Sequence, residues 1–219
     1  FNHRVLALPR MSEKKRAAVL TREFSTGGAD VTAPLDDYML LSTDKKTKAD
    51  TVLATRVESA VIETYINLAA ACGLKLYSID LALAGQIKLV RATPELAGKS
   101  FVVLQFDGDS LIAGLYEKGQ YKYSTRSRLF NPRGTEASGA EIGQKLSGLI
   151  QFQTAAKSEH PIKAVYFGGS TAADLAACMP ACRALQLEVA AYPETENIKL
   201  PDGIRLADIT LAAGNLIGR

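Results

Sequence analysis

Two glycine-containing turns carry the residue types in this sequence that suit ligand chemistry. The first lies in residues 165–171, where a β-prone run breaks at Gly168 and Gly169 and continues through Ser170 into a helix start. Glycines let a backbone approach a ligand closely, and the unpaired N–H groups of a helix N-terminus favour an anion. The pattern predicts a cradle for a phosphate or a nucleobase. A tight strand-to-helix turn that needs a positive φ is the alternative interpretation.

The second turn is Asp107-Gly108-Asp109-Ser110, which joins two apolar, strand-like runs. Its carboxylates and backbone amides are groups that hold a magnesium-bound phosphate in other proteins. Asp-Gly is also the commonest chemistry of a β-hairpin turn, so a plain hairpin stays open as the alternative.

No further set of residues suggests a catalytic or metal centre. The two histidines, His3 and His160, stand in no ligand-like spacing to Cys178 and Cys182. Neither histidine is near a turn with a plausible nucleophile, and no paired glutamates suggest glycoside chemistry. We therefore expect no catalytic residues, no metal, and no cofactor needed for stability.

Composition limits the class of protein. The chain has 219 residues, 47% hydrophobic and 22% charged, which is typical of a globular protein with a substantial core. A net charge of +3 does not suit a nucleic-acid-binding surface. No run approaches the roughly 18 uncharged apolar residues of a membrane span. Three cysteines in a chain of this length indicate a reducing compartment, the cytoplasm.

The first third of the sequence predicts a mixture of strands and helices. Apolar residues from Val57 to Cys72 recur at steps of three and four, which predicts a helix that Gly73 ends. We expect this apolar face to pack against a sheet, with a partner-binding face as the alternative. The other expected elements are a strand at 4–8, a helix at 13–24, a hairpin at 37–41 and 50–55, and a strand at 74–80.

The remainder predicts a sheet flanked by helices. Residues 101–106 form an apolar run of the kind found in strands buried on both faces, and two alternating runs follow it. Together they predict an antiparallel meander. The expected elements are helix 81–90, strands 101–106, 110–116 and 121–125, helix 136–157, strand 163–167, a helix at 171–185 shortened or bent near Pro180, strand 187–191, and helix 207–217.

The order of these elements resembles a known fold. A meander with an acidic-Gly-Ser turn, then a long helix, then a strand ending in Gly-Gly-Ser, resembles the second half of the actin-like ATPase fold. The first half is similar to the PilM family of pilus-assembly proteins, in the entry Pro34-Leu35-Asp36-Asp37-Tyr38 and in residues 61–80, where a helix, a Gly-Leu step and a strand ending in Asp80 follow one another. The resemblance covers nearly the whole chain.

The resemblance implies an α/β protein of the actin-like (ribonuclease H-like) class, with mixed sheets flanked by helices. It implies a strand at 1–8 that pairs with the large lobe, a small inserted lobe at 9–56 and an actin-like large lobe at 57–219. It also implies that the family's opening strands, with the first phosphate loop, precede this sequence. The family's second phosphate loop falls on Asp107, Gly108, Asp109 and Ser110, and its adenosine loop on Gly168, Gly169 and Ser170.

The phosphate loop departs from the family pattern of Asp, any residue, Gly and then hydroxyl residues. After Ser110 the chain continues with Leu111 and Ile112, whose side chains cannot donate to phosphate. We therefore expect little or no binding of ATP and magnesium. This favours a cytoplasmic scaffold of a type IV pilus or related secretion or competence machine over the alternative, an ATPase or a sugar- or acetate-kinase-like enzyme of the same superfold.

The resemblance also implies a partner, the cytoplasmic tail of an inner-membrane pilus assembly protein, with the chain at the inner face of that membrane. We expect the tail to bind beside the small lobe, at the large apolar side chains of Leu20, Phe24, Tyr38 and Met39, because Met and aromatic residues suit an adaptable groove. The alternative is that these four form the small lobe's own core. Homo-oligomerisation is left open.

Overall fold

The computed structural model describes residues 2–25 and 33–218. The chain forms two compact units, residues 1–79 and residues 80–219, which we describe separately. Within the described residues, no helix has both the length and the apolar character needed to cross a membrane.

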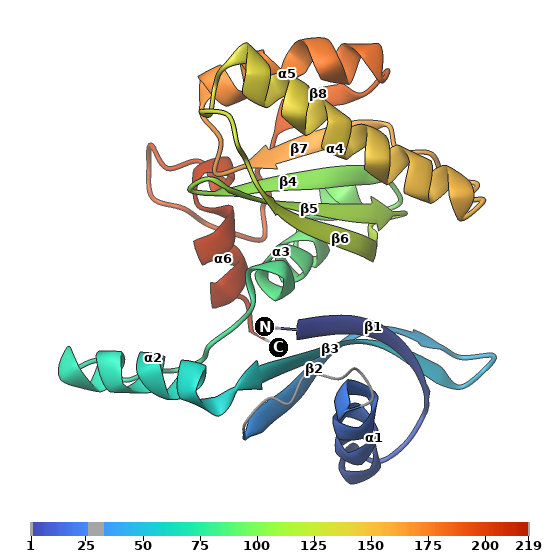
Figure 1. Cartoon of the computed structure of the whole chain (residues 1–219), viewed down its shortest axis with the longest axis vertical. Coiled ribbons are helices and arrows are strands. Elements are labelled where there is room, and N and C mark those ends of the chain that lie inside the picture. The colour runs from blue at the N-terminus through green and yellow to red at the C-terminus, as the bar shows by residue number, and fades with distance from the viewer. Residues whose placement is uncertain (1, 26–32, 219) are drawn as a thin grey trace. The chain divides into compact units, whose positions relative to one another are not determined.

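The first unit is a three-stranded antiparallel sheet with one helix on it (Figure 1). Its strands are β1 (Asn2–Pro9), β2 (Pro34–Asp44) and β3 (Ala49–Glu58), in the order β1-β3-β2, and its covering helix is α1 (Glu13–Ser25). The predicted strand, helix and hairpin are therefore confirmed. A bulge between Leu40 and Ser42 shifts the register of β2 against β3.

The core of this unit lies between α1 and one face of the sheet. Leu20 and Phe24 are one helical turn apart and are buried against Val52 and Ala54 of β3. Two ion pairs border this core. Arg16 contacts Asp50 at 2.6 Å, and the Arg56–Asp36 pair closes at 2.7 Å.

The expected pairing of residues 1–8 with the large lobe is wrong. β1 pairs with β3 in antiparallel register, with Leu6 opposite Val52 and Leu8 opposite Asp50. Leu8 is buried in the core beneath α1, and Leu6 packs against that core. A hairpin alone is marginal in water, and a third strand is the usual remedy. Periodicity assigns residues to a face, but it does not say which strand is the neighbour.

The helix predicted from Val57 is confirmed as α2 (Ser59–Ala71), but its predicted packing is wrong. No residue of α2 is buried, and Leu68 is 60% exposed. The strand expected at 74–80 is also absent: these residues have no regular structure, and Tyr77 is 97% exposed. A strand needs a neighbouring edge for its backbone hydrogen bonds, and the described part of the chain supplies none to this segment.

The second unit is a five-stranded mixed sheet in the order β6-β5-β4-β7-β8. The meander is antiparallel, as predicted, and β7 and β8 continue the sheet in parallel with β4. The strands are β4 (Phe101–Asp107), β5 (Ser110–Glu117), β6 (Gln120–Arg128), β7 (Ala164–Gly168) and β8 (Glu188–Ala191).

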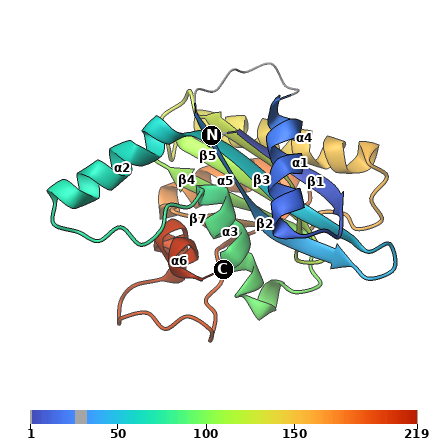
Figure 2. The ribbon, with the colours of Figure 1, turned by 90° about the horizontal axis from the view of Figure 1, so that it is seen from below.

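Helices cover both faces of this sheet (Figure 1). On one face, α4 (Glu136–Ala155) and α5 (Ala172–Ala184) pack over the main apolar core, and α5 continues through Pro180. On the other face, α3 (Ala82–Arg91) and α6 (Thr210–Leu216) lie side by side, as Figure 2 shows. Short 3₁₀ turns occupy Pro94–Leu96 and Leu206–Asp208.

Glycines allow the helix pairs to approach closely. A Cβ atom at Gly139 of α4 would collide with the backbone carbonyl of Ala177 of α5, and one at Gly214 of α6 would collide with the carbonyl of Gly85 of α3. The first contact fixes α5 against α4, and with it the loop that leads into α5.

Candidate functional site

The structure brings the two predicted turns together. β4 and β7 are parallel neighbours, and Gln105 is opposite Gly168. The turn after β4 and the loop after β7 therefore emerge at the same carboxyl edge of the sheet, where α/β sheets commonly bind ligands. They are in contact, because a Cβ atom at Gly169 would lie 2.7 Å from the carbonyl oxygen of Phe106. We call this region the carboxyl-edge site, formed by residues 107–110 and 168–170.

Arg133, a residue outside both predicted turns, links the two turns. Its guanidinium donates to the carbonyl oxygen of Gly108 at 3.3 Å and to that of Gly169 at 2.9 Å. It also lies 4.3 Å from the centre of the Phe106 ring, a cation–π contact. Arg133 sits in the loop between β6 and α4 and belongs to no motif, so no spacing in the sequence could have identified it.

The N-terminus of α5 is already capped by the chain itself. The Asp174 carboxylate accepts from the backbone N–H and the hydroxyl of Thr171, each at 2.8 Å, and the Thr171 hydroxyl accepts from the Asp174 N–H. The Asp174 side chain is 2% exposed, and Arg133 pairs with it at 2.6 Å. A phosphate at this helix end would therefore meet a buried carboxylate.

The electrostatics of Asp174 follow from these contacts. Burial alone raises the pKa of this carboxyl, but hydrogen bonds from Arg133 and Thr171 outweigh burial and hold the pKa below its usual value. Asp174 is therefore a carboxylate at neutral pH, and the positive charge of Arg133 is committed to it.

The glycine loop also uses its own polar groups. The Gly169 N–H donates to the carbonyl of Ala207 at 2.7 Å, and Gly169 has a φ of +64°. Gly168 is buried against the side chains of Gln105 and Thr210, which hydrogen bond to each other. Ser170 is half-buried. The N–H of Gly169, one of the predicted donors, is therefore not free to bind a ligand.

The Asp107–Ser110 turn has the geometry of a tight hairpin. Asp107 pairs with Ser110 across the turn, Gly108 has a φ of +57°, and Asp107, Gly108 and Asp109 are exposed. Asp109 faces Arg128 at 3.6 Å. The residues that replace the expected hydroxyl donors, Leu111 and Ile112, are buried.

The structure does not bring the four predicted partner-binding residues into one groove. Leu20 and Phe24 are 1% and 5% exposed in the core of the first unit. Tyr38 is half-buried on the same face, 4.7 Å beneath the Arg16 guanidinium. Met39 is half-buried, and as the next residue of β2 it faces the opposite side of the sheet. Tyr38 and Met39 therefore cannot line one surface.

The described residues contain no cluster of three or more His, Cys, Asp or Glu that could hold a metal ion. Cys178 and Cys182 belong to the apolar core beneath α4 and α5. Burial raises the pKa of the Cys178 thiol to about 12 and that of Cys182 to about 11, so both stay protonated and unreactive at neutral pH.

No protein-family model and no curated protein matches this chain. Among solved structures it is similar to the PilM-PilN type IV pilus biogenesis complex, with 14% identity, a TM-score of 0.75, and coverage of 97% of this chain and 74% of that chain. A Bacteroides thetaiotaomicron protein with an actin-like ATPase fold and unknown function is 13% identical, with a TM-score of 0.47 and coverage of 85% of this chain and 65% of that chain. At 14% identity, the first likeness shows the fold. The chain therefore shares the fold of the chain that it matches in the PilM-PilN complex, an α/β fold with sheets flanked by helices, as its sequence predicts.

Proposed function

We propose that this chain is a cytoplasmic, PilM-like scaffold of a type IV pilus or a related secretion or competence machine. In this role it lies against the inner face of the inner membrane and binds the cytoplasmic tail of a membrane partner. It turns over little or no nucleotide. The observation that carries the proposal is the fold likeness to the PilM-PilN complex over 97% of the chain.

The carboxyl-edge site supports the second half of the proposal. A nucleotide phosphate there needs free backbone N–H groups, a helix N-terminus and a positive charge. The Gly169 N–H is bonded to Ala207, Asp174 caps the helix, and Arg133 is paired with Asp174. Magnesium-ATP would have to displace these contacts before it could bind.

We place the tail on the first unit, at β2. This strand is an edge of its sheet, and addition of an extended peptide to a sheet edge is a common mode of peptide recognition. Tyr38 and Met39 would then contact the tail from opposite faces of the sheet, while Leu20 and Phe24 hold α1 against the face that carries Tyr38. In this proposal Leu20 and Phe24 do not contact the tail, and their role is to support the strand that binds it.

Two single substitutions test this placement. The probe is a soluble peptide with the sequence of the cytoplasmic tail of an inner-membrane pilus assembly protein from the same organism, and the readout is calorimetry. We expect wild-type binding at micromolar to millimolar strength, with Tyr38→Ala and Met39→Ala each weakening it several-fold. Tyr123→Ala, on β6 of the second unit, is the control, since Tyr123 is 38% exposed and lies outside the proposed surface. Equal binding by all three variants would move the tail site elsewhere.

The competing function is a nucleotide-dependent enzyme of the same superfold. It is favoured by the meeting of the two turns at one edge of the sheet. Micromolar affinity for magnesium-ATP, about −8 kcal/mol, would support it against the scaffold.

A further inference from the structure

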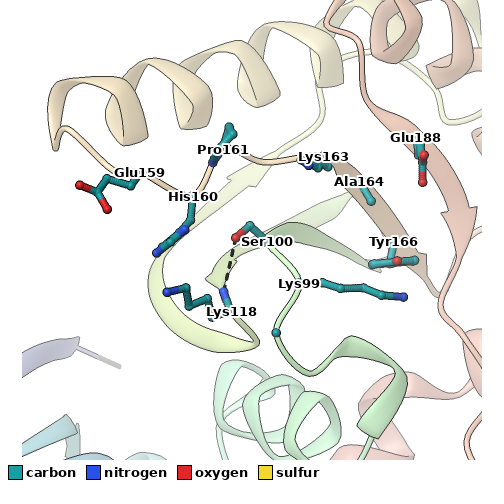
Figure 3. A pocket seen from close by; sticks show the side chains of 11 residues that line it. Lys99, Ser100, Lys118, Glu159, His160, Pro161, Lys163, Ala164, Tyr166 and Glu188 are labelled. Carbon is teal, nitrogen blue, oxygen red and sulfur yellow. Dashed lines mark hydrogen bonds between the residues drawn. The ribbon is translucent and has the colours of Figure 1, made fainter.

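A cavity lies at the edge of the second unit's sheet opposite to the carboxyl-edge site (Figure 3). It is a cavity of about 490 Å³ at the start of the parallel strands, whereas the carboxyl-edge site lies at their ends. This volume falls within the range of small-molecule sites. The lining residues come from the segments before β4 and β7, from the turn between β5 and β6, and from the start of β8.

The charge of this cavity comes from three lysines, Lys99, Lys118 and Lys163. Among the described residues, none of their ammonium groups forms an ion pair, whereas the more enclosed cations of this chain, such as Lys88 and Arg133, are paired with carboxylates. Two glutamates also line the cavity. Figure 3 shows the Glu159 carboxylate directed away from the other labelled side chains. The second glutamate, Glu188, acts electrostatically on Tyr166, another lining residue. With three lysines against two glutamates, the lining keeps an excess of one positive charge.

Hydroxyl and imidazole groups supplement the lysines. Figure 3 shows His160 beside Lys118, and Lys99 extending below Tyr166. Ser100 also lines the cavity, and its hydroxyl accepts a hydrogen bond from the backbone N–H of Lys118 at 3.4 Å. Donors thus surround the cavity from several directions.

Backbone hydrogen bonds hold the walls together. The backbone N–H of Gly119 donates to the carbonyl oxygen of Lys99 at 2.7 Å. In the same way, the N–H of Lys163 donates to the carbonyl oxygen of Ser100 at 3.1 Å, and the N–H of Glu188 to that of Lys163 at 2.9 Å. The buried Gln153 side chain donates to the His160 carbonyl at 2.7 Å. The lysine backbones are therefore fixed before any ligand arrives, which lowers the entropic cost of binding.

We propose that this cavity binds a small organic molecule that carries phosphate groups. No arginine lines it, so its cationic donors are lysines, which commonly bind phosphate as point charges. Tetrahedral phosphate oxygens accept from donors in several directions. The cavity exceeds a free phosphate in size, and the ring of Tyr166 and Pro161 provide an apolar wall for the organic part of the ligand. This inference does not depend on the scaffold function.

The test uses the full chain and inorganic pyrophosphate as the probe, in low-salt buffer without magnesium. We expect calorimetry to give a submillimolar dissociation constant and amide NMR shifts at residues 98–100, 118–119 and 160–166. Lys99→Ala, Lys118→Asn and Lys163→Ala should each weaken binding roughly tenfold, because each removes a charge-assisted contact. Lys118→Asn should keep the fold, since Lys118 has a φ of +52°, where asparagine is favoured.

Lys199→Ala is the matched control, because it removes the same charge outside the cavity lining. Four results would overturn the proposal. The first is no binding at 5 mM pyrophosphate. The second is binding that the three lysine variants leave unchanged. The third is NMR shifts confined to residues 107–110 and 168–170. The fourth is equally tight binding of citrate, which would show a response to charge alone.

Discussion

Removing the Arg133 side chain should destabilise the second unit strongly, although Arg133 belongs to no regular element. In Arg133→Ala, the Asp174 carboxylate loses its 2.6 Å partner while only 2% of its side chain is exposed. Breaking a buried ion pair by removing one member costs about 3–5 kcal/mol. Asp174 keeps its bonds from Thr171, and Arg133 itself is 26% exposed, which lowers that cost. The cation–π contact with Phe106 is lost as well. We therefore expect the free energy of unfolding to fall by about 2–3 kcal/mol.

Urea unfolding followed by circular dichroism measures the free energy of the chain, and hydrogen exchange of residues 164–184 assigns the change to β7 and α5. The control is Arg128→Ala, whose pair with Asp109 is 76% and 67% exposed and should contribute about 0–0.5 kcal/mol. Arg133→Ala combined with Asp174→Asn should recover part of the loss, because no unpaired charge remains. If Arg133→Ala costs no more than Arg128→Ala, the bridging role assigned to Arg133 is incorrect.

Three further predictions concern the pH response, the helix contacts and α2. Contacts with Arg133 and Thr171 hold the pKa of Asp174 below its usual value. Ionised Asp174 therefore stabilises the fold fully above about pH 4, and this stabilisation is lost as the pH falls through the lowered pKa. On acid titration, the free energy of unfolding should fall less in Arg133→Ala than in wild type. Gly139→Ala should lower the free energy of unfolding by about 1–3 kcal/mol because the added Cβ collides with Ala177. Gly148→Ala, in the same helix with nothing within 4 Å, should raise it by about 0.5–1 kcal/mol. Shifts of the urea midpoint in the same direction for both variants would contradict this. Tyr65→Lys with Leu68→Lys on α2, at 50% and 60% exposed, should change the unfolding free energy by about 0.5 kcal/mol or less; a loss above about 2 kcal/mol would show that this face is buried in solution.

The sequence predicted the fold where a pattern is local. Residues 101–106 are apolar except for Gln105, and they form the central strand β4 with helices on both faces. Gly168 ends β7 and Gly169 follows it with a φ of +64°, a conformation that glycine adopts readily where the strand turns toward the helix.

Contacts between distant residues were not predictable in the same way. Arg133 and Asp174 are 41 positions apart and meet only because β4 and β7 are neighbours. The apolar stripe of α2 gave the helix correctly, but an amphipathic period does not say whether a sheet lies against it. Residues 74–80 alternate as a strand would, yet find no strand edge in the described residues.

The scaffold proposal is tested most directly by one titration of the full chain with the cytoplasmic tail peptide of an inner-membrane pilus assembly protein from the same organism, with and without 5 mM magnesium-ATP. We predict the same micromolar to millimolar dissociation constant in both conditions, because the tail binds at β2 and the carboxyl-edge site is closed by Arg133 and Asp174. Absence of tail binding, or binding that appears only with magnesium-ATP, would contradict the proposal.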